Sequence, residues 1–345
     1  MTPDVRDLFE PESGYLNTAS VGVPPRTALT AMSQALDGWR RGQLSPSDFD
    51  DAVGRSRRAW AALTGVDPAS VATGTTVSEF VGLVAASLPD GAQVVVPAGE
   101  FTSVSFPFLA HADRGVVVRE FPLEQLHQVE GPVDLYAVSA VQSADGRLVD
   151  LPAVLAAAQA HGSQVLLDTT QSCGWLPLDV SEVDYVVCGA YKWLLSPRGT
   201  AFLAVRPDRL DGLRPLAAGW YAGEDPWNSI YGLPLRLAAD ARRFDLSPAW
   251  FCWVGAAESL ELLAGLDLAA VHAHDVGLAD SLLAGLGLPP RGSAIVTVDS
   301  PDADEHLAAA GVRAAVRAGR ARLSFHLYNQ QADVDLALQA LTGRR

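Results

Sequence analysis

A series of short, almost continuously apolar runs separated by helical patterns is the feature that most constrains how this chain folds. A strand that is apolar along its whole length is buried on both faces, which is typical of a parallel sheet with helices on either side. Helical patterns at 77–88 and 151–161 stand between such runs. The series predicts a three-layer α/β unit with a mainly parallel sheet, whose strands lie at 71–74, 93–97, 116–121, 133–139, 164–168, 184–188 and 200–205.

The two ends of the chain have a different character. Helical patterns cover 27–41 and 47–64 before the first apolar run, and Gly65 is expected to end the second helix. A stretch rich in Trp, Tyr, Gly and Pro at 219–234 has no clear period. Beyond it the sequence predicts a smaller α+β unit, with helices at 248–264, 268–286, 302–310 and from 332, and strands at 294–298, 312–317 and 320–327.

Length and composition agree with two domains. The chain has 345 residues, of which 49% are apolar, and a domain of about 150 residues is a usual size. We therefore expect a large α/β domain at 15–225. A small α+β domain is expected from 1–14 and 226–345.

The charge of the chain argues against polyanionic partners. Lys and Arg total 25 and Asp and Glu total 40, which gives a formal net charge of −15. Such a chain repels phosphate backbones and anionic lipid, so we expect neither nucleic acid nor a membrane surface as a partner. Helix N-termini and local basic groups can still hold a small anion. Residues 1–14 lack the pattern of a signal peptide, and no apolar run is long enough to cross a bilayer, so the expected location is the cytoplasm.

The cysteines point to no metal site. Cys173, Cys188 and Cys252 are odd in number, and their spacing matches no metal-binding pattern. Cys188 ends an apolar run, so we expect a buried core thiol there. No metal is predicted.

Polar residues follow several of the predicted strands. Ligands of parallel α/β sheets bind beyond the carboxyl ends of the strands. Gly74, Thr75 and Thr76 follow the first strand and open a helix. Backbone amides, hydroxyls and the positive end of the helix dipole meet there, and a phosphate would be stabilised. Ordinary helix capping by Thr is the alternative interpretation.

A carboxylate and a lysine stand at the ends of two further strands. Asp168 ends the strand at 164–168, with Gln171 after it, and could pair with a protonated ring nitrogen or cap a helix. Lys192 follows the strand at 184–188 and stands between two aromatic residues. Partial desolvation would lower its pKa and free the amine for Schiff-base chemistry. A solvated lysine is the alternative.

An aromatic ring and an arginine complete the candidate site. Phe101 follows the strand at 93–97, where its ring could lie on an aromatic cofactor or pack in the core. Arg322 lies on an alternating strand and could clamp a carboxylate bidentately, or be a solvated charge at a sheet edge. Each residue alone is ambiguous. Their order at successive strand ends suits a phosphorylated, protonated pyridine aldehyde.

In these segments the chain resembles the class V aminotransferase family, fold-type I enzymes that depend on pyridoxal 5′-phosphate (PLP) and include cysteine desulfurases, isopenicillin N epimerase and kynureninase. The resemblance runs over nearly the whole chain. It implies a fold-type I PLP-dependent transferase with PLP as a Schiff base on Lys192, and Asp168 on the pyridine nitrogen. The other cofactor contacts it implies are Gly74, Thr75, Thr76, Phe101, Gln171 and Tyr191. Arg322 and Asn17, the latter in a segment similar to the N-terminal signature, are expected to bind substrate.

The chain departs from the family pattern at several positions. Tyr191 stands where many relatives have His, and Phe101 where desulfurases stack His, and both are closer to kynureninase. No cysteine lies between Gly311 and Arg322, where desulfurases carry their persulfide-forming residue, so we expect that the enzyme is not a cysteine desulfurase. Gln142 or Ser143 stands in for the family's Asn beside the ring. Trp220 is expected to reach the phosphate, from its own chain or from the partner subunit, and core or interface packing is the alternative.

The resemblance implies chemistry at the α-carbon of a small amino acid or amino-acid-like substrate. We expect an aminotransferase or a β-eliminating C–S lyase, with an amino-acid epimerase of the same family as the alternative. A non-catalytic PLP-binding protein is a further alternative, although it has no need of Lys192 as a base. A nucleotide-binding protein is disfavoured because no Gly-rich fingerprint is present. Family members are usually homodimers, so a homodimer is expected.

Overall fold

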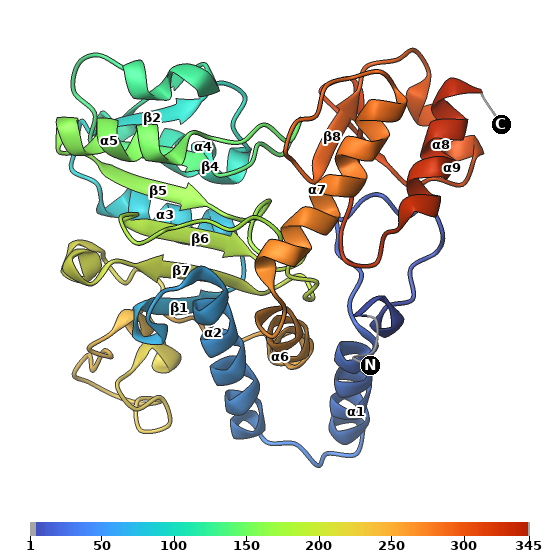
Figure 1. Cartoon of the computed structure of the whole chain (residues 1–345). Helices are drawn as coiled ribbons and strands as arrows, with labels where there is room; N and C mark the ends of the chain where they lie inside the picture. Colours follow the sequence, from blue (N-terminus) through green and yellow to red (C-terminus); the bar gives the residue numbers. More distant parts are fainter. Residues whose placement is uncertain (1–4, 344–345) are drawn as a thin grey trace.

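The computed structural model describes residues 5–343, and the ends of the predicted small domain, 1–4 and 344–345, lie outside the described residues. A mixed, mainly parallel sheet forms the larger part of the molecule, and a small three-stranded sheet lies beside it (Figure 1). The predicted α/β fold class with a smaller α+β part is therefore confirmed. No helix within 5–343 is long and apolar enough to cross a membrane.

The large sheet has the order β1-β7-β6-β5-β4-β2-β3. Its strands match the predicted apolar runs to within two residues at either end: β1 (Val71–Gly74), β2 (Gln93–Pro97), β3 (Val117–Phe121), β4 (Leu135–Ser139), β5 (Gln164–Asp168), β6 (Tyr185–Gly189) and β7 (Ala201–Val205). Strands β2 to β6 pair in parallel, whereas β7 is antiparallel to both β6 and β1. The carboxyl ends of β4, β5 and β6 therefore meet at one edge.

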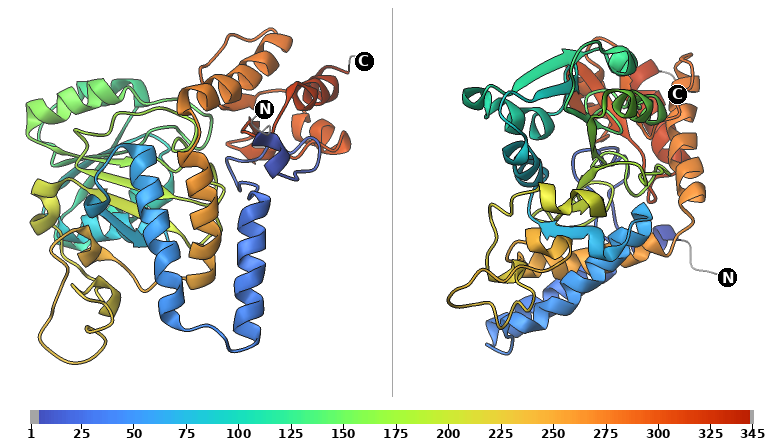
Figure 2. Two further views of the ribbon diagram at one scale, coloured as in Figure 1. Left: turned by 60° about the horizontal axis from the view of Figure 1, so that its bottom comes forward. Right: turned by 90° about the vertical axis from the view of Figure 1, so that its left-hand side faces the viewer.

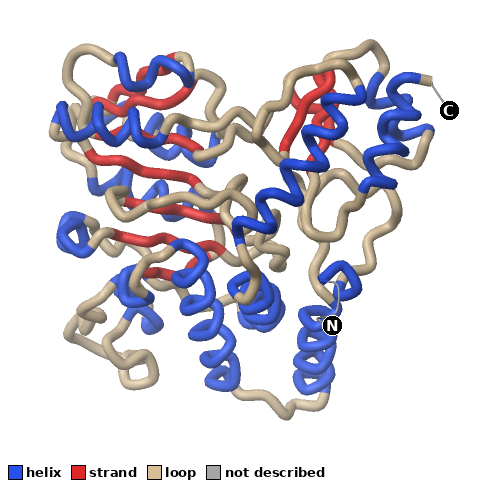
Figure 3. The backbone as a smooth tube through the Cα atoms, in the orientation of Figure 1, coloured by secondary structure: helices blue, strands red, loops and turns tan. Residues whose placement is uncertain are grey.

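Helices cover both faces of this sheet (Figure 3). Alternate strand residues enter two separate cores, as they must when side chains alternate along a strand. Helices α2 (Asp50–Thr64), α5 (Leu151–His161) and α6 (Trp250–Ala264) contribute to one core. Helices α3 (Val77–Ser87) and α4 (Thr102–Leu109) contribute to the other. Gly65 ends α2 in the left-handed conformation, as expected.

The small unit is built around an antiparallel sheet of order β8-β10-β9. Its strands are β8 (Ile295–Val298), β9 (Ala315–Arg317) and β10 (Arg320–Ser324), and its helices are α7 (Leu268–Gly285), α8 (Ala303–Ala309) and α9 (Gln331–Thr342). Leu16 of the N-terminal segment joins this core. The division at residue 225 stays a prediction, and α6, beyond that residue, packs with α2 and α1 (Arg26–Arg40) (Figure 2).

Helix α4 (Thr102–Leu109) is the α-helix that the sequence did not predict. It contains Pro107 and several aromatic residues without a clear helical period. Phe101 immediately precedes it as the N-cap residue. The turn after β2 therefore carries Phe101 on a helix N-terminus that faces the carboxyl edge of the sheet.

Candidate active site

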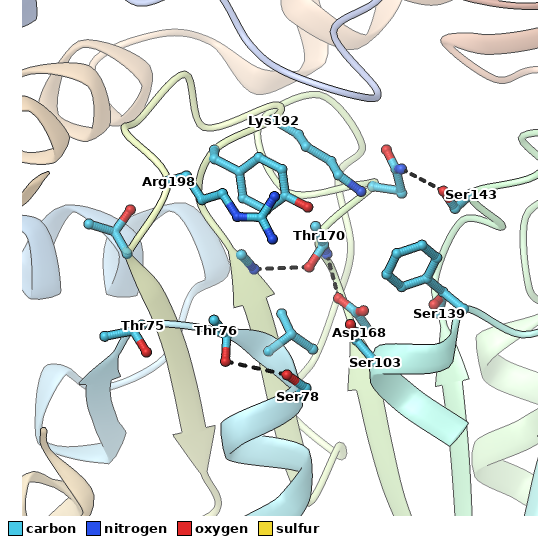
Figure 4. Close-up of a pocket in the computed structure, with 16 residues that line it drawn as sticks. Thr75, Thr76, Ser78, Ser103, Ser139, Ser143, Asp168, Thr170, Lys192 and Arg198 are labelled. Atoms are coloured by element: carbon cyan, nitrogen blue, oxygen red, sulfur yellow. Dashed lines mark hydrogen bonds between the residues drawn. The ribbon is translucent and has the colours of Figure 1, made fainter. Parts of the chain in front are cut away.

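A cleft lies at the carboxyl edge of the large sheet, beyond β5 and β6 (Figure 4). Its inner end is lined by residues that follow β1, β2, β4, β5 and β6, and its wider outer part is closed by the N-terminal segment and the small unit. Most of the predicted residues line it: Thr75, Thr76, Phe101, Ser143, Asp168, Gln171, Tyr191, Lys192 and Arg322.

Lys192 is a buried amine, with only 5% of its surface exposed. It stands in the turn after β6, and its Nζ lies 5.3 Å from the centroid of the Phe101 ring and 5.5 Å from that of Tyr191. Burial lowers the pKa of Lys192 to about 8, although the nearby Asp168 carboxylate acts in the opposite direction. A substantial fraction of the amine is therefore neutral near pH 8.

Asp168 presents a buried carboxylate at the end of β5. The backbone amide of Thr170 donates to its Oδ1 at 2.8 Å, which fixes the carboxylate toward the cleft. Burial raises the pKa of Asp168 to about 6, against the opposing effect of the hydrogen bonds from Thr170. The Thr170 hydroxyl in turn accepts from the backbone amide of Gly189 at 2.9 Å, so the ends of β5 and β6 are tied together.

Gln171 connects the turn after β5 to the lysine turn. Its Oε1 accepts from the indole N–H of Trp193 at 2.8 Å. Its Nε2 donates to the Ala19 carbonyl and to the Ser143 hydroxyl, each at 3.0 Å. Because Trp193 is the neighbour of Lys192 in the chain, this network holds the lysine turn in register with the Asp168 turn.

The threonines stand at the N-terminus of α3. Thr76 is the N-cap residue, and its hydroxyl accepts from the Glu79 amide at 3.3 Å, while the Thr75 hydroxyl donates to the Glu79 carboxylate at 2.8 Å. Both threonines also line the cleft. They can therefore cap helix α3 and contact a ligand at the same time. Gly74 is required by packing, because a Cβ atom there would lie 2.7 Å from the Phe80 ring.

Glu100, which the sequence analysis missed, organises the turn that carries Phe101. Its buried carboxylate accepts from the Ser139 amide at 2.8 Å, the Ser139 hydroxyl at 2.7 Å and the Phe101 amide at 2.7 Å. Gln142 also donates to it, at 3.1 Å. The Gln142 amide is thus directed to Glu100, and Ser143 is the neighbour that lines the cleft.

Arg322 is buried, with 1% of its surface exposed, and is not a solvated charge. Its guanidinium donates to the Ser143 carbonyl at 2.5 Å and to the Ser20 hydroxyl at 2.8 Å. Its Nε is buried and has no partner among the described residues. Burial lowers the pKa of Arg322 to about 10. An arginine held only by neutral oxygens at the wall of a cleft is suited to binding an anion.

Trp220 and Asn17, like Gly74 and Gln142, are not among the residues that line the cleft. Trp220 packs against Tyr221 and Trp227 in the segment that follows β7. Asn17 forms a bridge to Ser324 of β10, while its neighbours Ala19 and Ser20 line the cleft. The roles of Trp220 and Asn17 stay predictions.

The sequence holds one further signal for Lys192, and the structure adds one residue, Arg198, that no sequence pattern indicated. Lys192 is the only lysine of the chain, since 24 of the 25 basic residues are Arg. Arginine cannot form an imine, so Lys192 is the only side chain of the sequence that can bind an aldehyde as a Schiff base. Arg198 lines both parts of the cleft, and Figure 4 shows its guanidinium between Lys192 and the two threonines.

The donor set in the cleft fits pyridoxal 5′-phosphate. A helix N-terminus with hydroxyls suits the phosphate, a buried carboxylate suits a basic ring nitrogen, and a buried amine suits the aldehyde. The ring of Phe101 stands beside that amine. The unpartnered Nε of Arg322 leaves a donor for a substrate anion.

Comparison with known proteins agrees with this chemistry. Residues 48–305 match the family model described as aminotransferase class-V. The uncharacterized aminotransferase YcbU of Bacillus subtilis (strain 168) is 33% identical over 64% of this chain and 60% of its own length, so the chain spans less than two thirds of that relative. Isopenicillin N epimerase of Streptomyces clavuligerus is 29% identical over 86% of this chain and 80% of its own length.

Solved structures share the fold. The cysteine desulfurase CsdA from Escherichia coli superposes with a TM-score of 0.81 at 19% identity, over 98% of this chain and 95% of its own. The cystine C–S lyase C-DES, in complex with cysteine persulfide, has a TM-score of 0.85 at 24% identity. The match covers 96% of this chain and 97% of the C-DES chain.

The exclusion of cysteine desulfurases is corrected by these comparisons. A probable cysteine desulfurase from Halalkalibacterium halodurans is 24% identical over 95% of this chain and 92% of its own length, and CsdA shares the fold. A missing cysteine between Gly311 and Arg322 concerns one residue on a loop, whereas the relationship rests on the whole scaffold. The absence of that cysteine therefore does not separate this chain from the desulfurases.

The family match covers most of the chain. The chain belongs to the class V aminotransferase family, and its cofactor is pyridoxal 5′-phosphate.

Proposed function

We propose that the chain is an enzyme that acts at the α-carbon of a small amino acid or amino-acid-like substrate, with Lys192 as the residue that binds the cofactor and moves the proton. The observation that carries this proposal is that the only lysine of the chain is buried in the cleft beyond Asp168. The bound cofactor supplies an electron sink for the bond that breaks at the α-carbon.

Each of the other residues has a positioning role in this proposal. Asp168 would pair with the ring nitrogen and keep it protonated, which accounts for a buried carboxylate at the end of β5. Thr75 and Thr76, with the amides of α3, would hold the phosphate. Phe101 would lie against the ring. Arg322 would fix the α-carboxylate of the substrate, which orients one bond of the α-carbon for cleavage.

Lys192 would act as general base and then as general acid at the α-carbon. A pKa of about 8 suits both roles near neutral pH, because neither protonation state is rare there. The ring of Tyr191 lies 5.5 Å from the amine, and the burial of Lys192 limits its contact with water.

The proton that Lys192 removes can lead to several products. We propose transamination or β-elimination as the overall reaction. Epimerisation is the second candidate, and the similarity to isopenicillin N epimerase over 86% of the chain favours its inclusion. A panel of amino acids that includes cysteine, assayed for keto acid, thiol, sulfide and racemate, separates these reactions. Release of none of them contradicts the proposal.

The lysine assignment has a direct test. Borohydride should reduce the imine to a secondary amine, so that the yellow absorbance is lost but the reduced cofactor stays attached through dialysis, and mass spectrometry should find its added mass on the peptide that contains Lys192. The Lys192→Ala variant should lose the attached cofactor. Lys192→Arg is the matched control, since it keeps the charge but cannot form the covalent link. An unchanged amount of attached cofactor in either variant refutes the assignment.

A homodimer is part of the proposal. Trp220 packs against Trp227 and is not among the residues that line the cleft of its own chain, so in this proposal it reaches the phosphate of the partner subunit. Light scattering coupled to gel filtration tests this, and a monomeric holoenzyme with full activity contradicts it. Cytoplasmic location and the domain division at residue 225 stay predictions.

A further inference from the structure

The outer part of the cleft is strongly cationic, although the chain as a whole is acidic. This part has a volume of about 480 Å³ and is lined by Lys192, Arg198, Arg317 and Arg322. None of the described residues that line it is Asp or Glu. In a chain with a formal net charge of −15, three arginines without a carboxylate beside them in this lining make a local field that attracts anions.

Two of these guanidinium groups converge on one neutral hydroxyl. Arg322 donates to the Ser20 Oγ at 2.8 Å, and Arg317 donates to the same atom at 3.5 Å. The two nitrogens are therefore no farther apart than the sum of these distances. Burial is the larger cause of the lowered pKa of Arg322, and repulsion from the Arg317 charge lowers this pKa further.

Neither arginine has an internal counter-ion. Within residues 5–343 no ion pair involves Arg317 or Arg322, whereas Arg320, in the same hairpin, lies 3.7 Å from Asp145. Asp145 thus pairs with the arginine that is not part of the cleft lining, and the two arginines of the hairpin that line the cleft have no such partner among the described residues.

The two arginines lie at different depths. Arg322 is buried at the wall, whereas Arg317 is exposed at the end of β9, at the mouth of the cleft. If the ligand had only one carboxylate and this group bound Arg322, the guanidinium of Arg317 would still have no anionic partner. Apolar side chains, among them Val21, Leu29 and Met32, also line this part of the cleft. This arrangement suits a short aliphatic chain with an anionic group at each end.

We propose that the substrate carries a second anionic group besides its α-carboxylate, and that Arg317 binds it. The inference rests on the proposed function, in which Arg322 binds the α-carboxylate. The substrate class is therefore a dianionic amino acid whose two anionic groups are separated by a few bonds. Arg317 acts as a specificity-determining residue, and it has no part in the proton transfer by Lys192.

The test compares two inert ligands on the holoenzyme. Glutarate carries two carboxylates and butyrate carries one, and calorimetric titration gives the affinity of each. We expect glutarate to bind about tenfold more tightly than butyrate, the increment of a charge-assisted hydrogen bond. Arg317→Gln should abolish this preference and leave butyrate affinity unchanged. Arg320→Gln, the matched control with the same loss of charge, should retain the preference.

The remaining outcomes are decisive as well. Equal affinity of both ligands for the unmodified enzyme overturns the inference, as does an equal effect of Arg317→Gln and Arg320→Gln. Weaker binding of both ligands to Arg317→Gln would mean that Arg317 and Arg322 together bind the same carboxylate. That result also overturns the inference. A change only in dimer dissociation would assign Arg317 to a subunit contact instead. Arg322→Gln tests the proposed function separately, because undiminished butyrate binding in that variant contradicts the α-carboxylate site.

Discussion

Gly22 lies so close to Lys192 that a Cβ atom on Gly22 would stand 2.0 Å from the Lys192 carbonyl oxygen. The amide of Gly22 also donates to the Tyr191 carbonyl at 2.9 Å. The N-terminal segment therefore supports the lysine turn by direct backbone contact. A glycine is required at this position because of the close approach, and no unusual φ angle is involved.

Gly22→Ala is expected to displace the lysine turn. The clash is with backbone, which cannot move aside as a flexible side chain can, so the free energy of unfolding should fall by about 1–3 kcal/mol. The amount of cofactor that borohydride attaches covalently to Lys192 should fall as well. Gly82→Ala in α3 is the control, since a Cβ there meets nothing within 4 Å and Ala favours a helix by up to about 1 kcal/mol. Wild-type stability and cofactor content in Gly22→Ala would show that the contact is unimportant.

Chemical modification of Lys192 should reveal its lowered pKa. In the apoprotein the rate of acylation by an amine reagent is expected to rise through pH 8, because only the neutral amine reacts and burial lowers the pKa of Lys192 to about 8. No other lysine contributes to the signal. Lys192→Arg gives the background from the terminal amine. A midpoint near the ordinary value of 10.5 would mean that the amine is solvated.

Asp168→Asn should impair catalysis more than folding. The variant keeps the shape of the side chain but removes the charge proposed to pair with the ring nitrogen. Loss of one member of a buried charge pair costs about 3 kcal/mol or more, so kcat/KM should fall by about 100-fold or more. Steady-state kinetics with the best substrate of the panel measures this. A decrease of less than about threefold would remove Asp168 from the mechanism.

The same variant should change how stability depends on pH in the apoprotein. Burial raises the pKa of Asp168 from 3.8 to about 6, so this group favours the folded state when protonated. That contribution is complete below pH 3.8 and is lost as the pH rises through about 6. Asp168→Asn should therefore stabilise the apoprotein at pH 7–8 by about 1–3 kcal/mol. Urea unfolding at several pH values tests this, and parallel pH profiles for the two proteins would contradict it.

A buried ion pair between Arg57 and Asp245 should be important for stability. Arg57 Nη2 lies 2.6 Å from Asp245 Oδ2, and Asp245 Oδ1 accepts from the Thr73 amide at 2.8 Å, which joins α2 to β1. Asp245→Ala leaves a buried charge unpaired and should cost about 3–5 kcal/mol. Glu10→Gln, which breaks the exposed pair with Arg26, should cost less than about 1 kcal/mol. Similar losses in the two variants would contradict the assignment.

The strands of the large sheet were predictable because each is a short apolar run bounded by Gly, Pro or polar residues. Gln93–Pro97 and Gln164–Asp168 have the bounds that the sequence indicated. Helix α4 was not predictable, since Pro107 and a run of aromatic residues conceal its period. The antiparallel direction of β7 was also not predicted, because the apolar pattern of a strand is the same in either direction.

Some site residues required the tertiary structure. The sequence indicated Arg322, but the convergence of Arg317 on the same Ser20 hydroxyl depends on the hairpin between β9 and β10 and on its position against the N-terminal segment. Gln142 and Ser143 are neighbours in sequence and face different surroundings, Glu100 and the cleft. Sequence position does not reveal the direction of such side chains.

The sequence by itself determined the chemistry of the strand ends. Local patterns of apolar and turn-forming residues place Thr76, Asp168 and Lys192 at or just after the ends of predicted strands. Only the tertiary structure decided the shape and charge of the outer cleft. That cleft is assembled from the N-terminal segment, the lysine turn and the β9–β10 hairpin, which are far apart in the chain. Their mutual placement depends on packing between distant surfaces, and no short stretch of sequence encodes it.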